Sequence, residues 1–316
     1  MGLSSLILEA KTTPLLISAT SFQDMSLTYP NFTSLELRLK GITQLTSLEG
    51  LSSLKNLKIQ QTSVKTLSTN LLASLTNLDS LTIYHNNNLD AIPEDLLQNN
   101  LKLSQITIAN NPVTRLPAKL FSNLRKLSYL DLGTGFYKDI PPKLLEDSCQ
   151  SLKTFTMIYD SCNPHFTRSK KFYRYYPVRH RRTRMSNATQ GCVRHMPKEL
   201  LSNCQSLETF KYSTKSLNTR TVFPEDFFKG PKNLQSLTIH AELSDRVASK
   251  VLKDLQLLKR VDLSGNALKK IEHGELFKKL NCGQILGLQK SYKISFFFSR
   301  YFSYDNQGTA SELKSL

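Results

Sequence analysis

The strongest chemical signal in this 316-residue sequence is a basic segment between residues 163 and 195. It contains nine Lys or Arg residues and no acid, and five aromatic residues are interleaved with the charges. Cations of this kind neutralise phosphates while aromatic rings stack on bases, so the segment is a candidate anion-binding site. The residues that would bind the anion are Arg168, Lys170, Lys171, Arg174, Arg179, Arg181, Arg182 and Arg184.

Three interpretations of this basic segment stay open. It is translated non-coding sequence, a genuine disordered loop of the repeat array, or a functional loop that binds RNA or an anionic surface. Basic runs without a fold around them are common and unspecific, so nucleic acid is not the partner that we favour. The segment supplies nine of the 42 Lys and Arg residues, and the net charge of +17 is therefore a poor guide to the rest of the chain.

Patterns typical of catalysis are missing from the sequence. There is no G-x-S-x-G turn, H-E-x-x-H motif, phosphate-binding loop or dinucleotide fingerprint. His165, His180 and His195 all fall in the basic segment, which has no carboxylate to accompany them. The sequence therefore predicts a binding protein that is not an enzyme and uses no metal or cofactor.

A second set of polar and aromatic residues falls on short segments that alternate between apolar and polar side chains. Aromatic and charged side chains that project from such a surface favour protein binding. We predict a ligand-binding surface formed by Tyr84, His85, Tyr129, Asp131, Tyr159 and Lys211.

A repeat positions these candidates. Residues 103–113 (LSQITIANNPV) and 258–268 (LKRVDLSGNAL) fit the motif L-x-x-L-x-L-x-x-N-x-L, with Ile and Val as substitutes. Related motifs recur every 22 to 27 residues outside one longer gap, which is the period of leucine-rich repeats. They start at Phe32, Leu54, Leu78, Leu103, Leu127, Leu152, Leu207, Leu234 and Leu258.

Each motif predicts one strand with its fourth and sixth residues buried and its third, fifth, seventh and eighth residues outward. Stacked repeats give an α/β leucine-rich repeat solenoid, a curved horseshoe with a parallel sheet on its concave face. Short helical or irregular segments cover the convex face. The outward fifth positions form a ladder: Glu36, Lys58, Thr82, Thr107, Asp131, Thr156, Lys211, Thr238 and Asp262.

Asparagine at the ninth motif position can bond the backbone of the turn that leaves the strand, because its side chain both donates and accepts. Asn86, Asn111 and Asn266 occupy this position. We expect less well satisfied turns where it is missing, at Thr62, Gly135, Asp160 and Lys215.

The second half of a repeat is clearest in the pattern L-P-x-x-L-F-x-x-L-x-x-L-x-x-L-x-L, from Leu116 to Leu132. This pattern resembles the extracellular leucine-rich repeat proteins, and among them Toll-type receptor ectodomains. The resemblance covers residues 32–280. It implies a ligand-binding ectodomain fragment in innate immune or developmental signalling, a protein or pathogen-derived ligand, and a receptor dimer. The alternative is an intracellular leucine-rich repeat adaptor of the ubiquitin-ligase or phosphatase-regulator type.

Four regions follow from the repeat. Residues 1–31 are an N-terminal flank or degenerate cap, and residues 32–280 are an array of about nine units interrupted by the basic segment at 163–195. Residues 281–311 form a second non-repeat insert, and residues 312–316 begin a further truncated repeat. Both inserts delay the next motif by about 31 residues, read from the period of the neighbouring units.

Cysteines and sequons bear on the compartment. Cys149 and Cys204 occupy equivalent places in two similar segments, where we expect buried small apolar residues that successive turns could bring together. Cys162 and Cys192 could close the basic segment as a loop. Asn31 and Asn187 lie in N-glycosylation sequons. The resemblance implies an extracellular or cell-surface location, while the absence of a clear signal peptide or membrane-spanning run in the sequence leaves a cytoplasmic one open.

Overall fold

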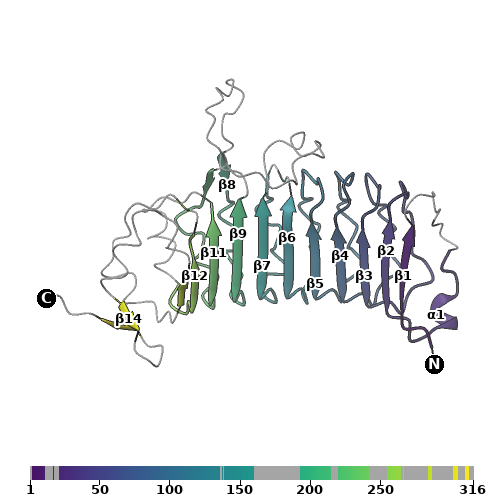
Figure 1. The fold of residues 1–316 in the computed structure, drawn as a ribbon, viewed down its shortest axis with the longest axis horizontal. Helices are drawn as coiled ribbons and strands as arrows, with labels where there is room; N and C mark the ends of the chain where they lie inside the picture. The colour runs from purple at the N-terminus through teal and green to yellow at the C-terminus, as the bar shows by residue number, and fades with distance from the viewer. Residues whose placement is uncertain are drawn as a thin grey trace, which may run out of the picture.

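The computed structural model describes residues 2–10, 17, 21–135, 137, 139–159, 193–214, 220–241, 255–264 and 266, and three short strands nearer the C-terminus. Eleven strands lie side by side in one parallel sheet along the molecule (Figure 1). They are β1 (Ser5–Ala10), β2 (Ser34–Leu39), β3 (Asn56–Gln60), β4 (Ser80–Tyr84), β5 (Gln105–Ala109), β6 (Tyr129–Gly135), β7 (Thr154–Tyr159), β9 (Thr209–Thr214), β11 (Ser236–His240), β12 (Arg260–Asp262) and β13 (Gln284–Leu286).

The remaining elements are short and stand outside this sheet. They form one helical turn, a two-stranded parallel sheet of β8 with β10, and a two-stranded antiparallel sheet of β14 with β15. Their bounds are α1 (Met25–Thr28), β8 (Val193–His195), β10 (Arg220–Val222), β14 (Phe302–Tyr304) and β15 (Ala310–Glu312).

One hydrophobic core lies between the sheet and the segments that connect its strands. In β2 the inward residues Leu35 and Leu37 are buried, and the outward residues between them are partly exposed. On the opposite side Leu120 and Phe121 fill the core behind Pro117. A single repeat could not bury its own apolar side chains. Stacking the repeats buries them between the strands on one side and the irregular apolar turns on the other. The predicted solenoid with a parallel sheet is therefore confirmed.

The sheet begins one strand earlier than predicted. Residues 1–31, predicted as a flank or cap, contribute β1, which pairs in parallel with β2 so that Ser5 lies opposite Ser34. A signal for this strand was present in the sequence, because the L-x-x-L-x-L spacing also occurs at Leu3, Leu6 and Leu8.

The sheet also ends later than predicted. Residues 281–311, predicted as a non-repeat insert, contribute β13, with Gln284 opposite Arg260 at the ordinary step of 24 residues (284 − 260). The insert prediction was therefore wrong for residues 284–286. The antiparallel pairing of β14 with β15 shows that Glu312 does not start a further strand of the parallel sheet. Residues 313–316 lie outside the described residues.

The parallel sheet is continuous across the position of the basic segment in the sequence. β7 pairs directly with β9, from Thr154 opposite Thr209 to Tyr159 opposite Thr214, although 55 residues (209 − 154) separate the partners. Its last three residues form β8, which pairs with β10 beside the sheet. Residues 160–192, and with them all the predicted anion-binding side chains, Asn187 and the loop between Cys162 and Cys192, lie outside the described residues.

Asparagines at the ninth motif position close turns across two repeats, as predicted. Asn86 Oδ1 accepts the backbone N–H of Thr62 at 3.0 Å, and its Nδ2 donates to the carbonyl of Ile59 at 3.1 Å. Asn111 accepts the N–H of Asn86 at 2.9 Å in the same way, one strand further along. Asn266 makes the equivalent contacts with the end of β11. Each asparagine thereby satisfies buried backbone of the preceding repeat.

Thr62 is held by the asparagine of the next repeat, because it donates both its N–H and its hydroxyl to Asn86 Oδ1. At one position without the asparagine another side chain takes over its role, so the prediction of a poorer turn was wrong there. At Gly135, the hydroxyl of the buried Tyr137 donates to the carbonyl of Ile108 at 3.4 Å, in place of an asparagine amide. A Cβ at residue 135 would lie 2.3 Å from this ring, so glycine makes room for it. The other two such positions, Asp160 and Lys215, lie outside the described residues.

Cys149 and Cys204 form a disulfide with their Cα atoms 4.1 Å apart. Both side chains are buried, as predicted, but they are paired rather than free apolar residues. The two similar segments that contain them precede β7 and β9, and the direct pairing of those strands brings the sulfurs together. The disulfide therefore encloses the whole basic segment.

Candidate functional site

The outward side chains of the parallel strands form a continuous surface, which we call the sheet face. The fifth motif positions lie opposite one another from strand to strand: Glu36 faces Lys58, and Thr156 faces Lys211. The predicted ladder is confirmed along its whole length and extended by one rung at Ile7. Its rungs are Ile7, Glu36, Lys58, Thr82, Thr107, Asp131, Thr156, Lys211, Thr238 and Asp262.

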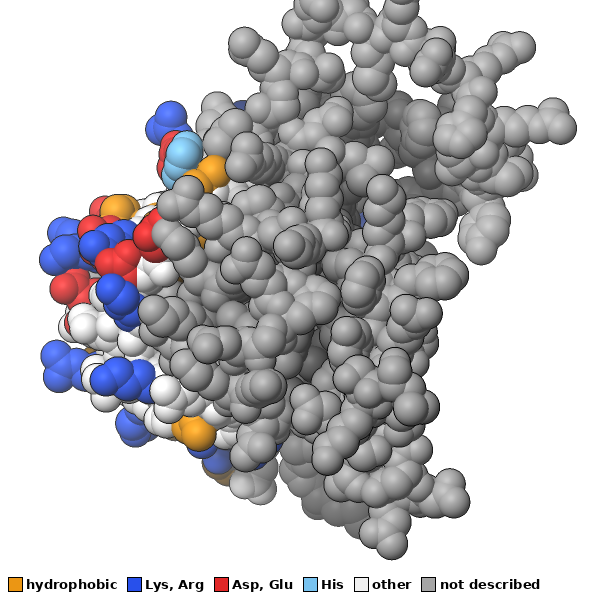
Figure 2. Space-filling view, turned by 90° about the vertical axis from the view of Figure 1, so that its left-hand side faces the viewer, with side chains coloured by type: hydrophobic (Ala, Val, Ile, Leu, Met, Phe, Trp, Pro, Cys, Tyr) orange, Lys and Arg blue, Asp and Glu red, His pale blue; other side chains and the backbone are white. Residues whose placement is uncertain are grey.

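Charges of both signs are interspersed over the described surface in the end-on view, and apolar side chains there are isolated (Figure 2). Among the described residues, no helix is long and apolar enough to cross a membrane. Within the same residues, no group of three or more metal-ligating side chains converges.

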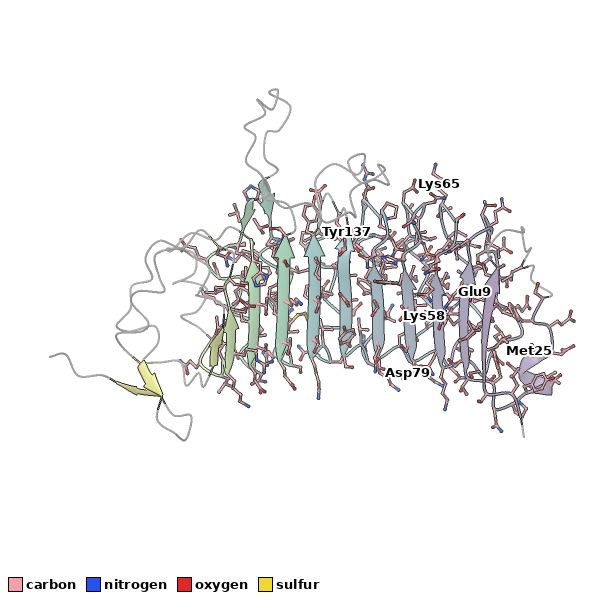
Figure 3. All side chains as sticks on the ribbon, in the orientation of Figure 1. Glu9, Met25, Lys58, Lys65, Asp79 and Tyr137 are labelled. Atoms are coloured by element: carbon pink, nitrogen blue, oxygen red, sulfur yellow. A yellow bond between two sulfur atoms is a disulfide. The ribbon has the colours of Figure 1, made fainter. Side chains whose placement is uncertain are left out.

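At the β2–β3 end of the sheet face, the acid of the ladder is surrounded by donors. Glu36 Oε1 accepts hydrogen bonds from Arg38 Nε and Gln60 Nε2. Lys58 Nζ lies 3.5 Å from the same oxygen, and Figure 3 labels Lys58 on the sheet. Burial alone would raise the pKa of Glu36, but the bonds and charges of Arg38 and Lys58 outweigh it and hold the pKa below its usual value. This cluster is internally satisfied.

The centre of the sheet face carries a different acid, Asp131 on β6. Its side chain is half-buried, and the N–H of Gly133 is a backbone donor to it. Its Oδ1 is fully buried and has no hydrogen-bond partner in the structure. Burial raises the pKa of Asp131 despite the opposing effects of Gly133 and of the positive charge on Lys211.

Tyr129, two residues before Asp131, shares its face of β6. The ring is 37% exposed, and burial together with the charge of Asp131 raises the pKa of its hydroxyl. Lys211 is exposed on β9, two strands from Asp131 with Thr156 between them. Of the predicted ligand-binding residues, the structure thus brings Tyr129, Asp131 and Lys211 onto one part of the sheet face.

Tyr84 and His85 form a separate pair at the end of β4. Their rings stack with centroids 4.2 Å apart and planes inclined by 29°. Tyr84 occupies the seventh motif position and Tyr129 the third, so they are offset by about 13 Å along the strands as well as by two strands across. The predicted aromatic cluster is therefore divided into two places.

The prediction that Tyr159 faces a ligand was wrong. This residue is buried, with only 2% of its surface exposed. The eighth motif position turns outward at His85, where φ is 55° and the strand has ended. At Tyr159 the strand continues, and its alternation places the eighth residue inward with the fourth and sixth.

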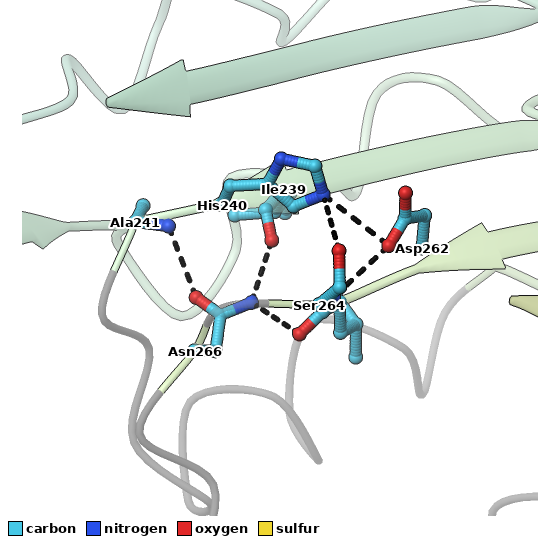
Figure 4. A network of polar contacts seen from close by, with 7 residues as sticks. Ile239, His240, Ala241, Asp262, Ser264 and Asn266 are labelled. Atoms are coloured by element: carbon cyan, nitrogen blue, oxygen red, sulfur yellow. Dashed lines mark hydrogen bonds and ion pairs between the residues drawn. The ribbon is translucent and has the colours of Figure 1, made fainter. Parts of the chain in front are cut away.

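A polar network at the far end of the sheet face was not predicted (Figure 4). His240 Nε2 lies 3.2 Å from Asp262 Oδ1 and 3.0 Å from Ser264 Oγ. Burial raises the pKa of Asp262, but hydrogen bonds from Ser264 and His240 outweigh it and lower the pKa. A signal was available, because these residues occupy outward positions of adjacent repeats.

This network lacks the geometry of a hydrolytic triad. In a triad the serine and the carboxylate engage different nitrogens of the imidazole, so that one orients the base that the other uses. Here Ser264 Oγ and Asp262 Oδ1 both approach Nε2 of His240. The arrangement therefore satisfies a carboxylate rather than activating a hydroxyl.

Sequence comparison supports the repeat class. Residues 15–153 match six copies of the family model described as "BspA type Leucine rich repeat region". Among curated proteins no sequence matches the chain. Fold and sheet face together define a leucine-rich repeat solenoid.

Among solved structures, the chain resembles the Toll ectodomain. It aligns with Toll in the structure of the Drosophila Toll–Spätzle complex with a TM-score of 0.60 and 18% identity over 89% of this chain. The glycosylated form of that complex gives 0.59 and 20% over 84%. The chain spans only 37% and 34% of those Toll chains. The likeness shows the fold and says that the chain resembles a fragment of a Toll-type ectodomain.

Proposed function

We propose that this chain is a ligand-binding fragment of an extracellular recognition protein of the Toll-receptor kind. It binds a protein or pathogen-derived ligand on the sheet face and contributes to innate immune or developmental signalling through a receptor dimer. The observation that carries the proposal is the unbroken ladder, whose fifth motif positions lie opposite one another from strand to strand, including from β7 to β9, between which the basic segment falls in the sequence. A rigid, repeated surface of this kind is suited to holding a large partner.

The disulfide favours the extracellular proposal over an intracellular adaptor. Disulfides persist in oxidising compartments and are rare in the cytosol. Cys149 and Cys204 are paired, and Asn31, in the first sequon, is exposed. Secretory expression should yield protein with a glycan on Asn31 and no free thiol at either cysteine. Recovery from the cytosol of native cells with both thiols reduced would favour the adaptor.

A glycan on the sheet face tests the binding surface. The variant T156N/I158T creates a sequon at two outward positions of β7. The control L101T places a threonine two residues after the exposed Asn99, which creates a sequon in the turn before β5. Spätzle, named with Toll in the similar structures, is the first probe, followed by a panel of secreted proteins.

The probe protein that binds the native chain is the captured ligand. We expect the glycan on β7 to abolish its binding and the control glycan to leave its binding intact, with both variants secreted in similar amounts. Mass spectrometry confirms that each sequon is occupied. Undiminished binding to the β7-glycosylated protein would move the ligand to another surface.

A further inference from the structure

Three acids stand on the same ladder of the sheet face, and they differ in how they are compensated. Glu36, Asp131 and Asp262 all occupy the fifth motif position, on β2, β6 and β12. They share a backbone setting and an outward direction. Differences among them therefore arise from their neighbours rather than from the fold.

Two of the three acids are satisfied by their own chain. Glu36 receives Arg38, Lys58 and Gln60. Asp262 Oδ1 accepts the N–H of Ser264 at 2.9 Å and lies 3.2 Å from His240 Nε2. Each has a cationic or cation-capable partner on an adjacent strand.

Asp131 has no such partner among the described residues. Its buried Oδ1 accepts no hydrogen bond, and the nearest cation on the ladder, Lys211, is two strands away, or about 10 Å. A half-buried carboxylate that lacks a counter-charge costs free energy until a donor arrives. The two carboxylate oxygens share one charge, so a cation at the exposed side of the group compensates both.

The residues around Asp131 are short. Its rung neighbours are Thr107 and Thr156, and the seventh positions beside it are Ala109 and Gly133. At the corresponding place near Glu36 the chain supplies Arg38 and Gln60. The charged and amide side chains that surround Glu36 are thus replaced here by shorter, uncharged ones.

We propose that Asp131 is the anchoring carboxylate for an arginine side chain of the protein ligand, with the exposed ring of Tyr129 beside it. This inference rests on the proposed function and names the chemistry of its partner. A guanidinium fits because it carries several N–H donors on one planar cation that also stacks on aromatic faces. Lysine would bind less tightly, since its compact ammonium stacks poorly on the ring of Tyr129.

Peptides on beads provide the probe. End-blocked Gly-Ser heptapeptides carry one central arginine, lysine or citrulline, and citrulline keeps the shape of arginine without its charge. The full-length chain is compared with Asp131→Asn, and with Glu36→Gln and Asp262→Asn as matched controls on the same ladder. Circular dichroism and thermal midpoints verify that each variant is folded.

We expect the native chain to be retained most strongly by the arginine peptide, less by the lysine peptide and least by the citrulline peptide. The preference for arginine over citrulline should be about tenfold, as for one charged hydrogen-bonded pair. Asp131→Asn should abolish the preference, and both controls should keep it. Equal retention of citrulline and arginine by the native chain, or an unchanged preference in Asp131→Asn, would overturn the proposal. Loss in all three variants would also overturn it, because the effect would then be general electrostatics.

The captured ligand separates this inference from the function on which it rests. Ligand that is blocked by the β7 glycan but unaffected by Asp131→Asn would leave sheet-face recognition standing and remove Asp131 from it. Ligand insensitive to the glycan would remove both.

Discussion

From β3 to β5 neighbouring repeats are held together by the same asparagine contact each time, whereas from β6 to β9 they are held together by several different contacts. In the first region Asn86 and Asn111 each close the turn of the preceding repeat. In the second region Tyr137 replaces an asparagine, and a disulfide joins the segments before β7 and β9. The pairing between strands therefore keeps the ladder in register at the fifth motif position, although the register of β6 with β7 shifts after Leu132 and the turns are closed by unrelated chemistry.

The largest expected effect on stability comes from the second region, between β6 and β9. Replacing Cys149 and Cys204 together by alanine removes a crosslink between residues 55 apart. Because the crosslink limits the entropy of the unfolded chain, we expect a loss of about 4 kcal/mol in the free energy of unfolding. Denaturant titration measures it. A reductant should weaken the native protein equally and leave the double variant unchanged; a loss below about 1 kcal/mol would contradict the prediction.

The next largest effect on stability comes from the first region, between β3 and β5. Asn86→Ala leaves the N–H of Thr62 and the carbonyl of Ile59 buried without their partner, so we expect a loss of about 3 kcal/mol. Asn88→Ala is the control, because its exposed amide makes a single bond of 3.3 Å to Ser63. Thermal unfolding compares the two. Similar losses in both variants would show that the asparagine contacts between repeats contribute little to stability.

A third change tests whether Tyr137 is a true substitute for asparagine. Gly135→Ala places a Cβ 2.3 Å from the Tyr137 ring, and displacing the ring from its site should cost about 2 kcal/mol. Gly133→Ala is milder, since its Cβ would lie 3.0 Å from Asp131 Oδ1. Hydrogen exchange near β6 would report the displacement. If Gly135→Ala were the less harmful of the two, the ring would not be fixed as described.

The smallest effects distinguish Glu36 on β2 from Asp131 on β6 by the pH dependence of stability. The lowered pKa of Glu36 gives stability above its unfolded value, about 4.3, which is lost as pH falls through the folded pKa. The raised pKa of Asp131, whose charge interacts with Tyr129, Tyr137 and Lys211, has the opposite effect on stability. Its cost is present at neutral pH, declines as pH falls through its folded pKa, and disappears below about 3.9.

Substitution makes this contrast measurable. At pH 7, Glu36→Gln should lose about 0.5 kcal/mol after allowance for solvent screening. Asp131→Asn should lose nothing or gain stability, because it removes an incompletely compensated charge. Denaturant unfolding at pH 7 and pH 4 would show the two differences. A loss of stability in Asp131→Asn at pH 7 would mean that its carboxylate is better satisfied than the structure indicates.

Period and alternation were sufficient to predict nine strands of the parallel sheet, from β2 to β12, and the register of the ladder. The ladder from Glu36 to Asp262 depends only on which residue of each motif faces outward, and that follows from the extended backbone. The role of Asn86 was predictable for a related reason, since one residue type recurred at one place in the motif.

Features that depend on a single backbone angle or on a distant partner were not predictable. His85 and Tyr159 occupy the same motif position, yet one faces outward with φ of 55° and the other stays in the strand and is buried. The missing partner of Asp131 depends on which side chains lie across the neighbouring strands, and the motif leaves those positions free to vary. The pairing of Cys149 with Cys204 required knowing that β7 and β9 remain adjacent.

The disulfide has a consequence for the covalent integrity of the chain. Residues 160–192 contain eight Lys or Arg residues, each a site at which trypsin-like proteases can cut. Cys149 and Cys204 lie on either side of that segment. A molecule nicked anywhere between them therefore remains one covalent unit, migrating as a single species without reductant and as two fragments with it.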